Sequence, residues 1–215
     1  MKIYLVRHAQ TKSNLEERAC KNQKEEGLTR EGEKQAKILV KKLSKIKFDK
    51  IFISEAKRSF ETILPLIKLK KDILVRRDKH LNECNFGIFG GLSLKRAEKK
   101  YPGIFKKRWK DKWNIAIPRG ESYKDLAFRL ESFFKNLKRE SKKSQLKNVL
   151  IITHATPIKV FLIKYLGFSV EKAESIYFEN TSVSIFDFRN EKIKPIKIND
   201  YSHIKKSKIS CEDCS

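Results

Sequence analysis

Short apolar runs alternate with helical patterns along the chain. Four runs have the length and the bulky aliphatic composition of buried strands: residues 2–6, 50–53, 73–76 and 148–153. Between them, apolar side chains recur every three or four residues, which predicts amphipathic helices at 29–46, 56–69 and 121–139. Because strands that alternate with helices favour a parallel sheet covered on both faces, we expect an α/β fold. Its expected form is a three-layer α/β/α sandwich with a mostly parallel central sheet.

Four residues mark predicted helix ends or breaks. Thr29 is a plausible N-cap for the first helix, since a threonine hydroxyl can accept a hydrogen bond from the first turn. Pro65 predicts a break or kink in the second helix, because proline lacks the N–H that the helix needs. After the strand at 148–153, Thr156 is expected to cap another helix, with Pro157 at its first position.

The end of the chain predicts an antiparallel edge. Apolar and polar residues alternate at 183–188, and with 192–198 they suggest a hairpin that turns at 189–191. This hairpin would place an antiparallel strand at the edge of the sheet. The last fifteen residues, 201–215, are basic and polar, and we expect a mobile tail.

Residues 85–120 differ from the rest of the chain. They are rich in glycine, lysine and aromatic residues and show no strand pattern. We expect an insertion with short helices, one of them at 93–101, that lies over the sheet or beside the functional site. The predicted organisation is therefore a single domain, 1–200, with this insertion over the site.

Length and composition suit one domain with a real core. The chain has 215 residues, of which 40% are hydrophobic, yet it has no run of about 18 apolar residues that could span a membrane. The N-terminus lacks the long apolar stretch of a signal peptide, so we expect a cytoplasmic protein. Cys20 and Cys84 stand alone, whereas Cys211 and Cys214 form one C-x-x-C with only His203 nearby. Free thiols fit this pattern better than a zinc site.

A formal charge of +24 raises the question of nucleic acid binding. The excess is mostly lysine and is spread along the whole chain, with no aromatic-basic motif and no zinc-finger spacing. Scattered lysines favour a solvated surface, and nucleic acid is not the expected partner. The positive field would nevertheless help to gather anionic substrates.

Polar residues follow the ends of the predicted strands. Arg7 and His8 come directly after the first strand, and His154 comes directly after the strand at 148–153. Arg58 follows the second strand closely, and Glu83 follows the third. Ligands of open α/β sheets bind beyond the carboxyl ends of the strands, so these side chains are expected to meet in one site.

This set of side chains favours phosphate chemistry. A metal site would need more carboxylates or thiolates, and a serine hydrolase would need a G-x-S-x-G turn that the chain lacks. Arginine binds phosphate in bidentate fashion, and the first amides of the helix that holds Ala155 and Thr156 would face the same anion. A neutral imidazole could then act as nucleophile, and Glu83 could protonate the leaving oxygen. A phosphate beside Glu83 would favour the protonated carboxyl.

Five segments, in this order, resemble motifs of the histidine phosphatase superfamily, in its phosphoglycerate mutase-like branch. They are LVRHAQTKSN (5–14), ISEAKRSFET (53–62), LNECNFGIFGGLS (81–93), RGESYKDLAFR (119–129) and IITHATPIKV (151–160). The resemblance implies a phosphoglycerate mutase-like fold and a phosphohistidine intermediate. It also implies that neither a metal nor another cofactor is needed.

The resemblance also implies roles for individual residues. His8 would be the phosphorylated nucleophile and Glu83 the proton donor. The transferring phosphoryl group would be bound by Arg7, Arg58, His154 and Asn14. Glu121 and Ser122 would be structural or would support the site from behind, with Ser122 able to reach the pocket.

The chain departs from the family pattern in places that bear on the substrate. Ala9 and Ala155 follow the two histidines where glycine is common, and the family tolerates both. Gly90 stands where an acidic residue is common, and residues 19–27 fit poorly, with Gln23 near the place of a glutamine that often faces the substrate. The identity of the substrate therefore stays open.

Three functions remain to be weighed. The first is a metal-independent phosphomonoesterase that hydrolyses a small phosphorylated metabolite. The second is a phosphoglycerate mutase; the stretch after Glu83 is shorter than in such mutases, which favours hydrolysis, and Lys106-Lys107-Arg108 does not match their arginine pair. The third is a non-catalytic module that binds phosphate or nucleic acid. Trp109 and Trp113 either line an apolar pocket for the leaving group or anchor the insertion. Monomer and homodimer are both compatible with the sequence.

Overall fold

The computed structural model describes residues 1–22, 24–70, 72–189 and 192–205. Its centre is a six-stranded sheet with the order β3-β2-β4-β1-β5-β6. The strands are β1 (Lys2–Arg7), β2 (Lys50–Ile53), β3 (Val75–Arg77), β4 (Asn148–Thr153), β5 (Val183–Arg189) and β6 (Lys192–Asp200). The first four in the spatial order run parallel, and β5 pairs antiparallel with both β1 and β6.

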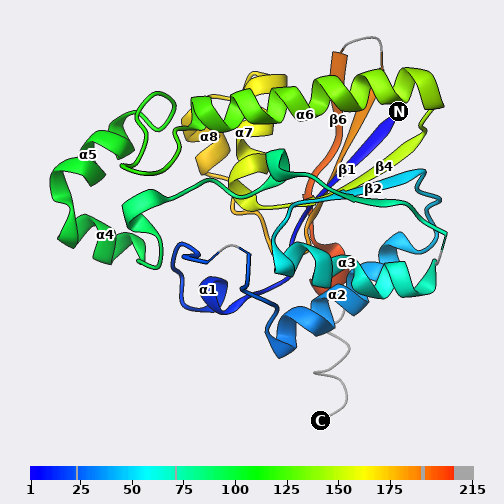
Figure 1. Ribbon diagram of the computed structural model, residues 1–215, viewed down its shortest axis with the longest axis horizontal. Coiled ribbons are helices and arrows are strands. Elements are labelled where there is room, and N and C mark those ends of the chain that lie inside the picture. The colour runs from blue at the N-terminus through cyan, green and yellow to red at the C-terminus, as the bar shows by residue number, and fades with distance from the viewer. Residues whose placement is uncertain (23, 71, 190–191, 206–215) are drawn as a thin grey trace.

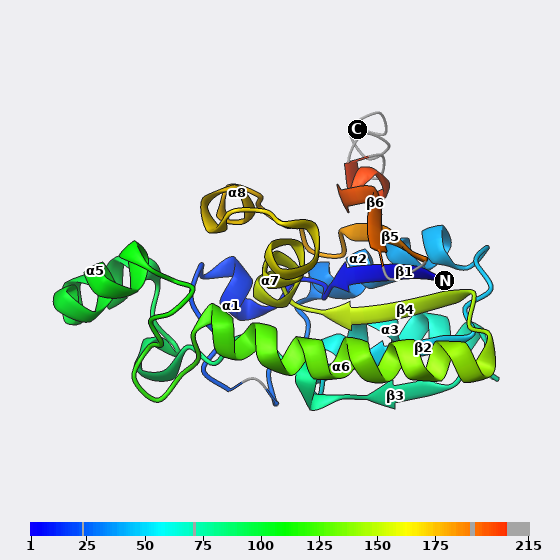
Figure 2. The same cartoon turned by 90° about the horizontal axis from the view of Figure 1, so that it is seen from above.

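Helices cover both faces of this sheet (Figure 1). They are α1 (Lys12–Leu15), α2 (Arg30–Leu43), α3 (Lys57–Leu69), α4 (Leu94–Lys100), α5 (Pro102–Lys110), α6 (Tyr123–Ser144), α7 (Ala155–Leu166) and α8 (Val170–Glu174). Two 3₁₀ turns, Lys79–Leu81 and Gly87–Phe89, lie between β3 and α4. Helices α2 and α3 lie on one side of the strands and α6 and α7 on the other (Figure 2). The predicted three-layer α/β/α sandwich is confirmed.

The alternation of side chains along β1 divides the core into two layers. Ile3 and Leu5 belong to a cluster with residues of α6 and α7, whereas Tyr4 and Val6 belong to a cluster with residues of α2 and α3. Successive side chains of a strand point to opposite faces, so a strand that is buried on both faces is apolar throughout. This is why the run that begins the chain reads as continuously hydrophobic.

The predicted elements are present, with shifted ends. Thr29 is the N-cap of α2 and accepts a hydrogen bond from the Gly32 amide, as predicted. Of the two outcomes predicted for Pro65, the break is wrong, because α3 is a single helix with Pro65 inside it, and the kink stays a prediction. Burial of Ile63 and Leu66 against the sheet offsets the missing hydrogen bond. Strands β5 and β6 form the predicted hairpin, whose turn at 190–191 lies outside the described residues.

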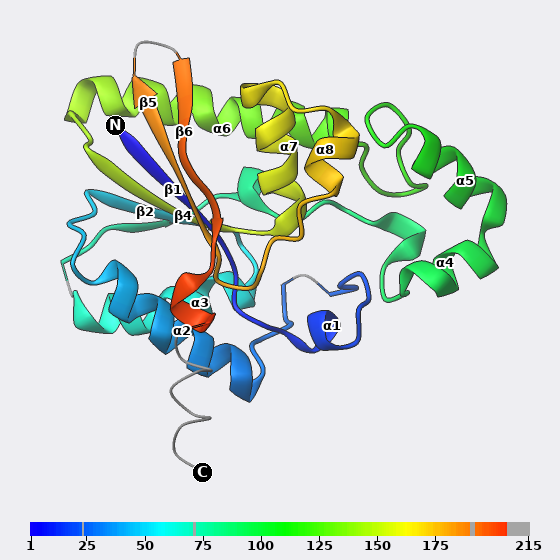
Figure 3. The ribbon, with the colours of Figure 1, turned by 180° about the vertical axis from the view of Figure 1, so that it is seen from behind.

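The insertion at 85–120 contains α4 and α5 and lies beyond one end of the sheet, beside α1 (Figure 3). A small apolar cluster around Phe89, Ala97 and Ile117 holds it together. Trp113 packs against the main core and Trp109 stays partly exposed, so each tryptophan fits one of the two expected roles.

Ordered contacts continue past residue 200, where the tail was expected to begin. Residues 202–205 form a helical turn, and His203 is 3.1 Å from the Thr181 hydroxyl through Nε2. The remaining part of the predicted tail, with Cys211 and Cys214, lies outside the described residues. Within the described part of the chain, no helix is both long and apolar enough to cross a bilayer.

Candidate active site

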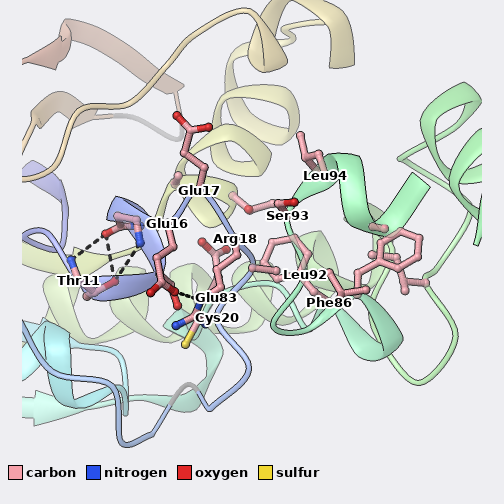
Figure 4. Close-up of a pocket in the computed structure, with 18 of the residues that line it drawn as sticks. Thr11, Glu16, Glu17, Arg18, Cys20, Glu83, Phe86, Leu92, Ser93 and Leu94 are labelled. Carbon is pink, nitrogen blue, oxygen red and sulfur yellow. Dashed lines mark hydrogen bonds and ion pairs between the residues drawn. The ribbon is translucent and has the colours of Figure 1, made fainter. Parts of the chain in front are cut away.

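The candidate active site lies at the carboxyl end of the parallel strands. A pocket of about 730 Å³ opens there, within the range of small-ligand sites. Figure 4 shows residues that line it: Thr11, Glu16, Glu17, Arg18 and Cys20 come from the segment after β1, and Phe86, Leu92, Ser93 and Leu94 come from the insertion. The two segments meet at a backbone hydrogen bond from the Ala19 amide to the Leu92 carbonyl. The insertion thus lines part of the pocket.

His8 is buried at the end of β1 in one defined tautomer. Its Nδ1 lies 2.7 Å from the carbonyl oxygen of Ala9, which can only accept a hydrogen bond, so Nδ1 carries the proton. Its Nε2 accepts a hydrogen bond from Nε of Arg58 at 3.3 Å. Burial, and then the charges of Arg58 and Arg7, lower the pKa of His8 well below its usual value. The imidazole is therefore neutral at physiological pH, with a lone pair on Nε2.

His154, at the end of β4, is held in the other tautomer, with its proton on Nε2. NH2 of Arg58 lies 3.2 Å from its Nδ1, and since arginine only donates, Nδ1 is an acceptor. The Nε2–H then donates to the Ser54 hydroxyl at 2.9 Å. Burial, Arg58 and His8 lower the pKa of His154 well below its usual value. Arg58 thus bridges two neutral histidines whose ring centres are 5.0 Å apart.

Hydrogen bonds to the segment before β5 hold Arg7 and His8 in place. NH1 of Arg7 donates to the carbonyl of Phe178, while Nε of Arg7 is buried without a hydrogen-bond partner. The side-chain amide of Asn180 donates to the carbonyl of His8 at 3.0 Å and to Oδ1 of Asn14 at 3.1 Å. Asn180 therefore ties the candidate nucleophile to a predicted phosphate ligand.

Sequence reasoning missed Asn180. Its one sequence signal is its position just before β5, which pairs with β1. An asparagine that precedes a strand is usually a turn residue, so this signal is weak. The pairing of β5 with β1 is what brings Asn180 to the back of His8.

Glu83 lines the same pocket after the 3₁₀ turn that follows β3. Its carboxylate accepts a hydrogen bond from the Cys84 amide at 2.8 Å and another from the Thr156 hydroxyl. Burial raises the pKa of Glu83 more than these hydrogen bonds and the nearby arginines lower it. A carboxyl group that is easier to protonate suits proton donation, and here the cause is burial.

The start of α7 differs from the prediction. His154 occupies the N-cap position without a side-chain capping bond, so Thr156 does not cap the helix and Pro157 is its third residue. The helix begins immediately after β4, and the Thr156 hydroxyl is engaged by Glu83 instead. Ala155 and Thr156 still line the pocket in the first turn of α7.

The structure brings the predicted site residues together. The pocket is lined by Arg7, His8, Asn14, Arg58, Glu83, Ala155 and Thr156. His154 lies directly behind them through its contact with Arg58. Ser122 instead caps α6 and bonds Asp125, and Glu121 pairs with Arg129, so both are structural. Gln23 lies outside the described residues.

The positive charge of the site comes from arginine. Arg7 and Arg58 are both nine-tenths buried or more and face the pocket beside His8. In the described part of the chain, no group of three His, Cys, Asp or Glu side chains could hold a metal ion. The geometry suits an anion with several oxygens, because two guanidinium groups and a helix start converge on one point.

Comparisons with known proteins agree with this geometry. The model of the histidine phosphatase superfamily (branch 1) matches residues 3–201. Phosphoserine phosphatase 1 of Hydrogenobacter thermophilus is 26% identical over 204 residues, which are 95% of this chain and 94% of that protein. The solved structure of YhfR from Bacillus stearothermophilus has a TM-score of 0.82 and 26% identity, and covers 94% of this chain and 98% of that chain. The chain belongs to the histidine phosphatase superfamily.

The fold subclass is also confirmed. The structure of phosphoglycerate mutase from Bacillus anthracis has a TM-score of 0.80 at 21% identity, and covers 97% of this chain and 96% of that chain. The fold is phosphoglycerate mutase-like. The family and its phosphatase-named relatives make the chain a phosphoric monoester hydrolase for small phosphorylated metabolites, as the motifs predicted.

Proposed function

We propose that this hydrolase works through a phosphohistidine on Nε2 of His8 and needs no metal ion. The observation that carries the proposal is the tautomer of His8, whose Nδ1–H faces the Ala9 carbonyl while Nε2 accepts from Arg58. A neutral imidazole with an available lone pair is the form that attacks phosphorus. Burial and the charges of Arg58 and Arg7 lower the pKa of His8, which favours this neutral form.

The arginines neutralise the negative charge of the bound phosphate. When a phosphate monoester enters, the donors of Arg58 that face the two histidines and the unpartnered Nε of Arg7 turn to its oxygens. Asn14 and the first amides of α7, at Ala155 and Thr156, complete the set of donors. His154, close to the incoming dianion, gains a proton more readily and then donates to the phosphoryl group. Such fixed donors stabilise the charge of the transition state as a metal ion would.

Glu83 handles the proton of the leaving group. In the first step Nε2 of His8 forms a bond to phosphorus, the P–O bond to the alcohol breaks, and the Glu83 carboxyl protonates the alcohol oxygen. In the second step the Glu83 carboxylate takes a proton from water, the water oxygen attacks phosphorus, and the P–N bond breaks. Inorganic phosphate and neutral His8 result. The raised pKa of Glu83 supports its role as the acid in the first step.

The nature of the pocket supports a small substrate. A volume of about 730 Å³ admits a metabolite, whereas a phosphoprotein would need an open groove. The name of one relative, phosphoserine phosphatase, suggests phosphoserine as a first substrate to assay. Two free thiols, Cys20 and Cys84, support a reducing, cytoplasmic environment. Monomer and homodimer both remain compatible with an active site built from one chain.

The decisive experiment is hydrolysis of p-nitrophenyl phosphate in excess EDTA by the wild type and by His8→Ala. We expect turnover that survives EDTA and disappears in the variant. A rapid acid-free quench should trap an acid-labile phosphoenzyme in the wild type only. His80→Ala is a matched control, because His80 lies outside the pocket and contacts Asp78. Residual activity of His8→Ala above a few per cent would exclude His8 as the nucleophile.

The same samples test the two other functions. Transfer of the phosphoryl group between hydroxyls that depends on a bisphosphorylated primer, with little hydrolysis, would favour the mutase. Salt-dependent retention on DNA without turnover of any ester would favour a binding module.

A further inference from the structure

Arg108 is a buried arginine that the proposed mechanism does not use. It lies in α5, within the insertion, and is 3% exposed. Its Nε and NH1 atoms are buried and have no hydrogen-bond partner. Among the described residues, these two atoms and Nε of Arg7 are the only buried side-chain nitrogens in that state. Arg7 and Arg108 line the same pocket, so the unpaired nitrogen donors of the described residues gather there.

The neighbours of Arg108 do not satisfy these donors. Its guanidinium carbon lies 4.8 Å from the centre of the Tyr123 ring, a cation–π contact that uses the face of the group. The N–H donors lie in the plane of the guanidinium, so the ring leaves them unpaired. The charge of Glu174 acts on Arg108, yet this carboxylate already accepts from Tyr123 and Lys112 and pairs with Lys159.

A buried arginine with unpaired donors lowers the stability of the folded protein. Desolvation by burial lowers the pKa of Arg108, which means that the fold disfavours its charge. An unpaired buried donor costs about 1–3 kcal/mol, and more when it carries a charge. No group of the protein accepts a hydrogen bond from these donors. A bound anion would supply the missing hydrogen bonds and offset the cost.

Arg108 enters the pocket from a different element than the residues of the phosphoryl site. His8 follows β1 and Glu83 follows the turn after β3, whereas Arg108 belongs to α5 of the insertion, and all three line the same pocket. Apolar side chains of the insertion, among them Phe86, Phe89 and Trp109, line the same cavity. Lys112 lies beside Arg108 and adds positive charge, held at 2.5 Å from Glu174. A substrate whose phosphate meets His8 would therefore direct its leaving-group end toward Arg108.

We propose that Arg108, assisted by Lys112, forms a second anion subsite that binds a carboxylate or second phosphate on the leaving-group part of the substrate. The inference rests on the proposed function, because it assigns that end of the pocket to the leaving group. It narrows the substrate class to small phosphate monoesters that carry a second negative group. Neutral or cationic leaving groups would leave the donors of Arg108 unsatisfied.

Matched pairs of substrates test this subsite. O-phosphoserine and O-phosphoethanolamine differ by one carboxylate, and glycerol 1,3-bisphosphate and glycerol 1-phosphate differ by one phosphate. We expect the wild type to prefer the member with the second anionic group, in at least one pair, by about 10- to 100-fold in kcat/KM, the range that charged hydrogen bonds supply. The pair that shows the preference identifies the group that Arg108 binds.

Variants then assign the preference to Arg108. In Arg108→Gln the preference within the pair should fall at least about tenfold, and Arg108→Lys should restore part of it, because the charge returns without the planar fork. Lys107→Gln removes the same charge from the exposed face of α5 and should keep the wild-type preference. The ratio of the two kcat/KM values within a substrate pair does not depend on the concentration of active protein, so a general loss of activity does not affect it.

Each remaining outcome overturns the inference. A wild type with no preference in either pair excludes the subsite, whether or not the Arg108 variants fold. A preference that survives in Arg108→Gln excludes Arg108 as its source. Hydrolysis of p-nitrophenyl phosphate separates these results from failure of the proposed function: if the wild type hydrolyses none of the five esters, the proposed function and the inference both fail.

Discussion

Replacement of Glu83 by glutamine tests the chemical step most directly. The variant keeps a side chain of nearly the same shape, and its amide oxygen can still accept from the Cys84 amide at 2.8 Å and from the Thr156 hydroxyl. It cannot deliver a proton. Because burial raises the pKa of Glu83, the fold disfavours the carboxylate, and a neutral glutamine should not destabilise the protein. A change in rate then reports chemistry.

The size of the loss should depend on the leaving group. A positioned general acid contributes about 10²- to 10⁴-fold, and an alkyl alcohol needs all of it because an alkoxide leaves poorly. A nitrophenolate leaves without a proton. We therefore expect Glu83→Gln to lose about 10²- to 10⁴-fold in kcat/KM on glycerol 1-phosphate and less than about tenfold on p-nitrophenyl phosphate.

The pH dependence provides an independent measure. In the wild type, the ratio of alkyl ester to nitrophenyl ester hydrolysis should fall as pH rises through the elevated pKa of Glu83, because the acid form is lost. In Glu83→Gln the ratio should not vary with pH. Equal losses on both esters, or a sloping ratio in the variant, would refute the proton-donor role.

Four further predictions follow from single contacts. Arg58→Lys keeps the positive charge but loses the guanidinium group that contacts both histidines, so kcat should fall at least about tenfold while inhibition by inorganic phosphate persists. An unchanged kcat would contradict the bridging role of Arg58. Asn180→Ala removes one buried and one partly buried hydrogen bond, so the free energy of unfolding, measured by urea titration, should fall by about 1–3 kcal/mol, and kcat should fall as well. Loss of stability without loss of kcat would exclude positioning of His8 by Asn180. Gly32→Ala would set a Cβ 2.2 Å from the Gln10 carbonyl oxygen and should lower the melting temperature by several degrees; an unchanged melting temperature would show that the loop yields. Burial lowers the pKa of His203 to about 4, so the unfolded chain binds more protons than the folded protein between pH 6.5 and 4, and the free energy of unfolding falls as the pH drops through this range. His203→Gln should reduce this dependence of the free energy of unfolding on pH, and an equal dependence in the variant would refute the assignment to His203.

Much of the fold could be predicted because the core is patterned locally. The parallel strands β1, β2 and β4 are buried on both faces, so a continuous apolar run such as Ile3–Val6 is visible without the structure. The end of each run then locates a polar residue at the sheet edge, which is how Arg7, His8 and His154 could be placed together. Their convergence needs only the general rule that parallel strands end at the same side.

Other features could not be predicted because they depend on contacts between distant segments. Asn180 reaches His8 only because β5 pairs with β1. Thr156 does not cap α7 as expected, and its hydroxyl donates a hydrogen bond to Glu83 instead. The break at Pro65 was predicted from backbone geometry, whereas packing of α3 on the sheet keeps the helix intact. In each case tertiary packing outweighs a local preference.

The class of fold, the family and the group of phosphate-binding side chains could be read from the amino-acid sequence, because strand burial and motif order are properties of neighbouring residues. Three properties needed the folded structure: which nitrogen of His8 carries the proton, why the pKa of Glu83 is raised, and that Arg108, which lines the pocket, has donors without a partner. Those properties arise from desolvation and from hydrogen-bond partners that lie far away along the chain. Reaction type could thus be inferred from a linear pattern, whereas substrate selection had to wait for the three-dimensional arrangement of the insertion.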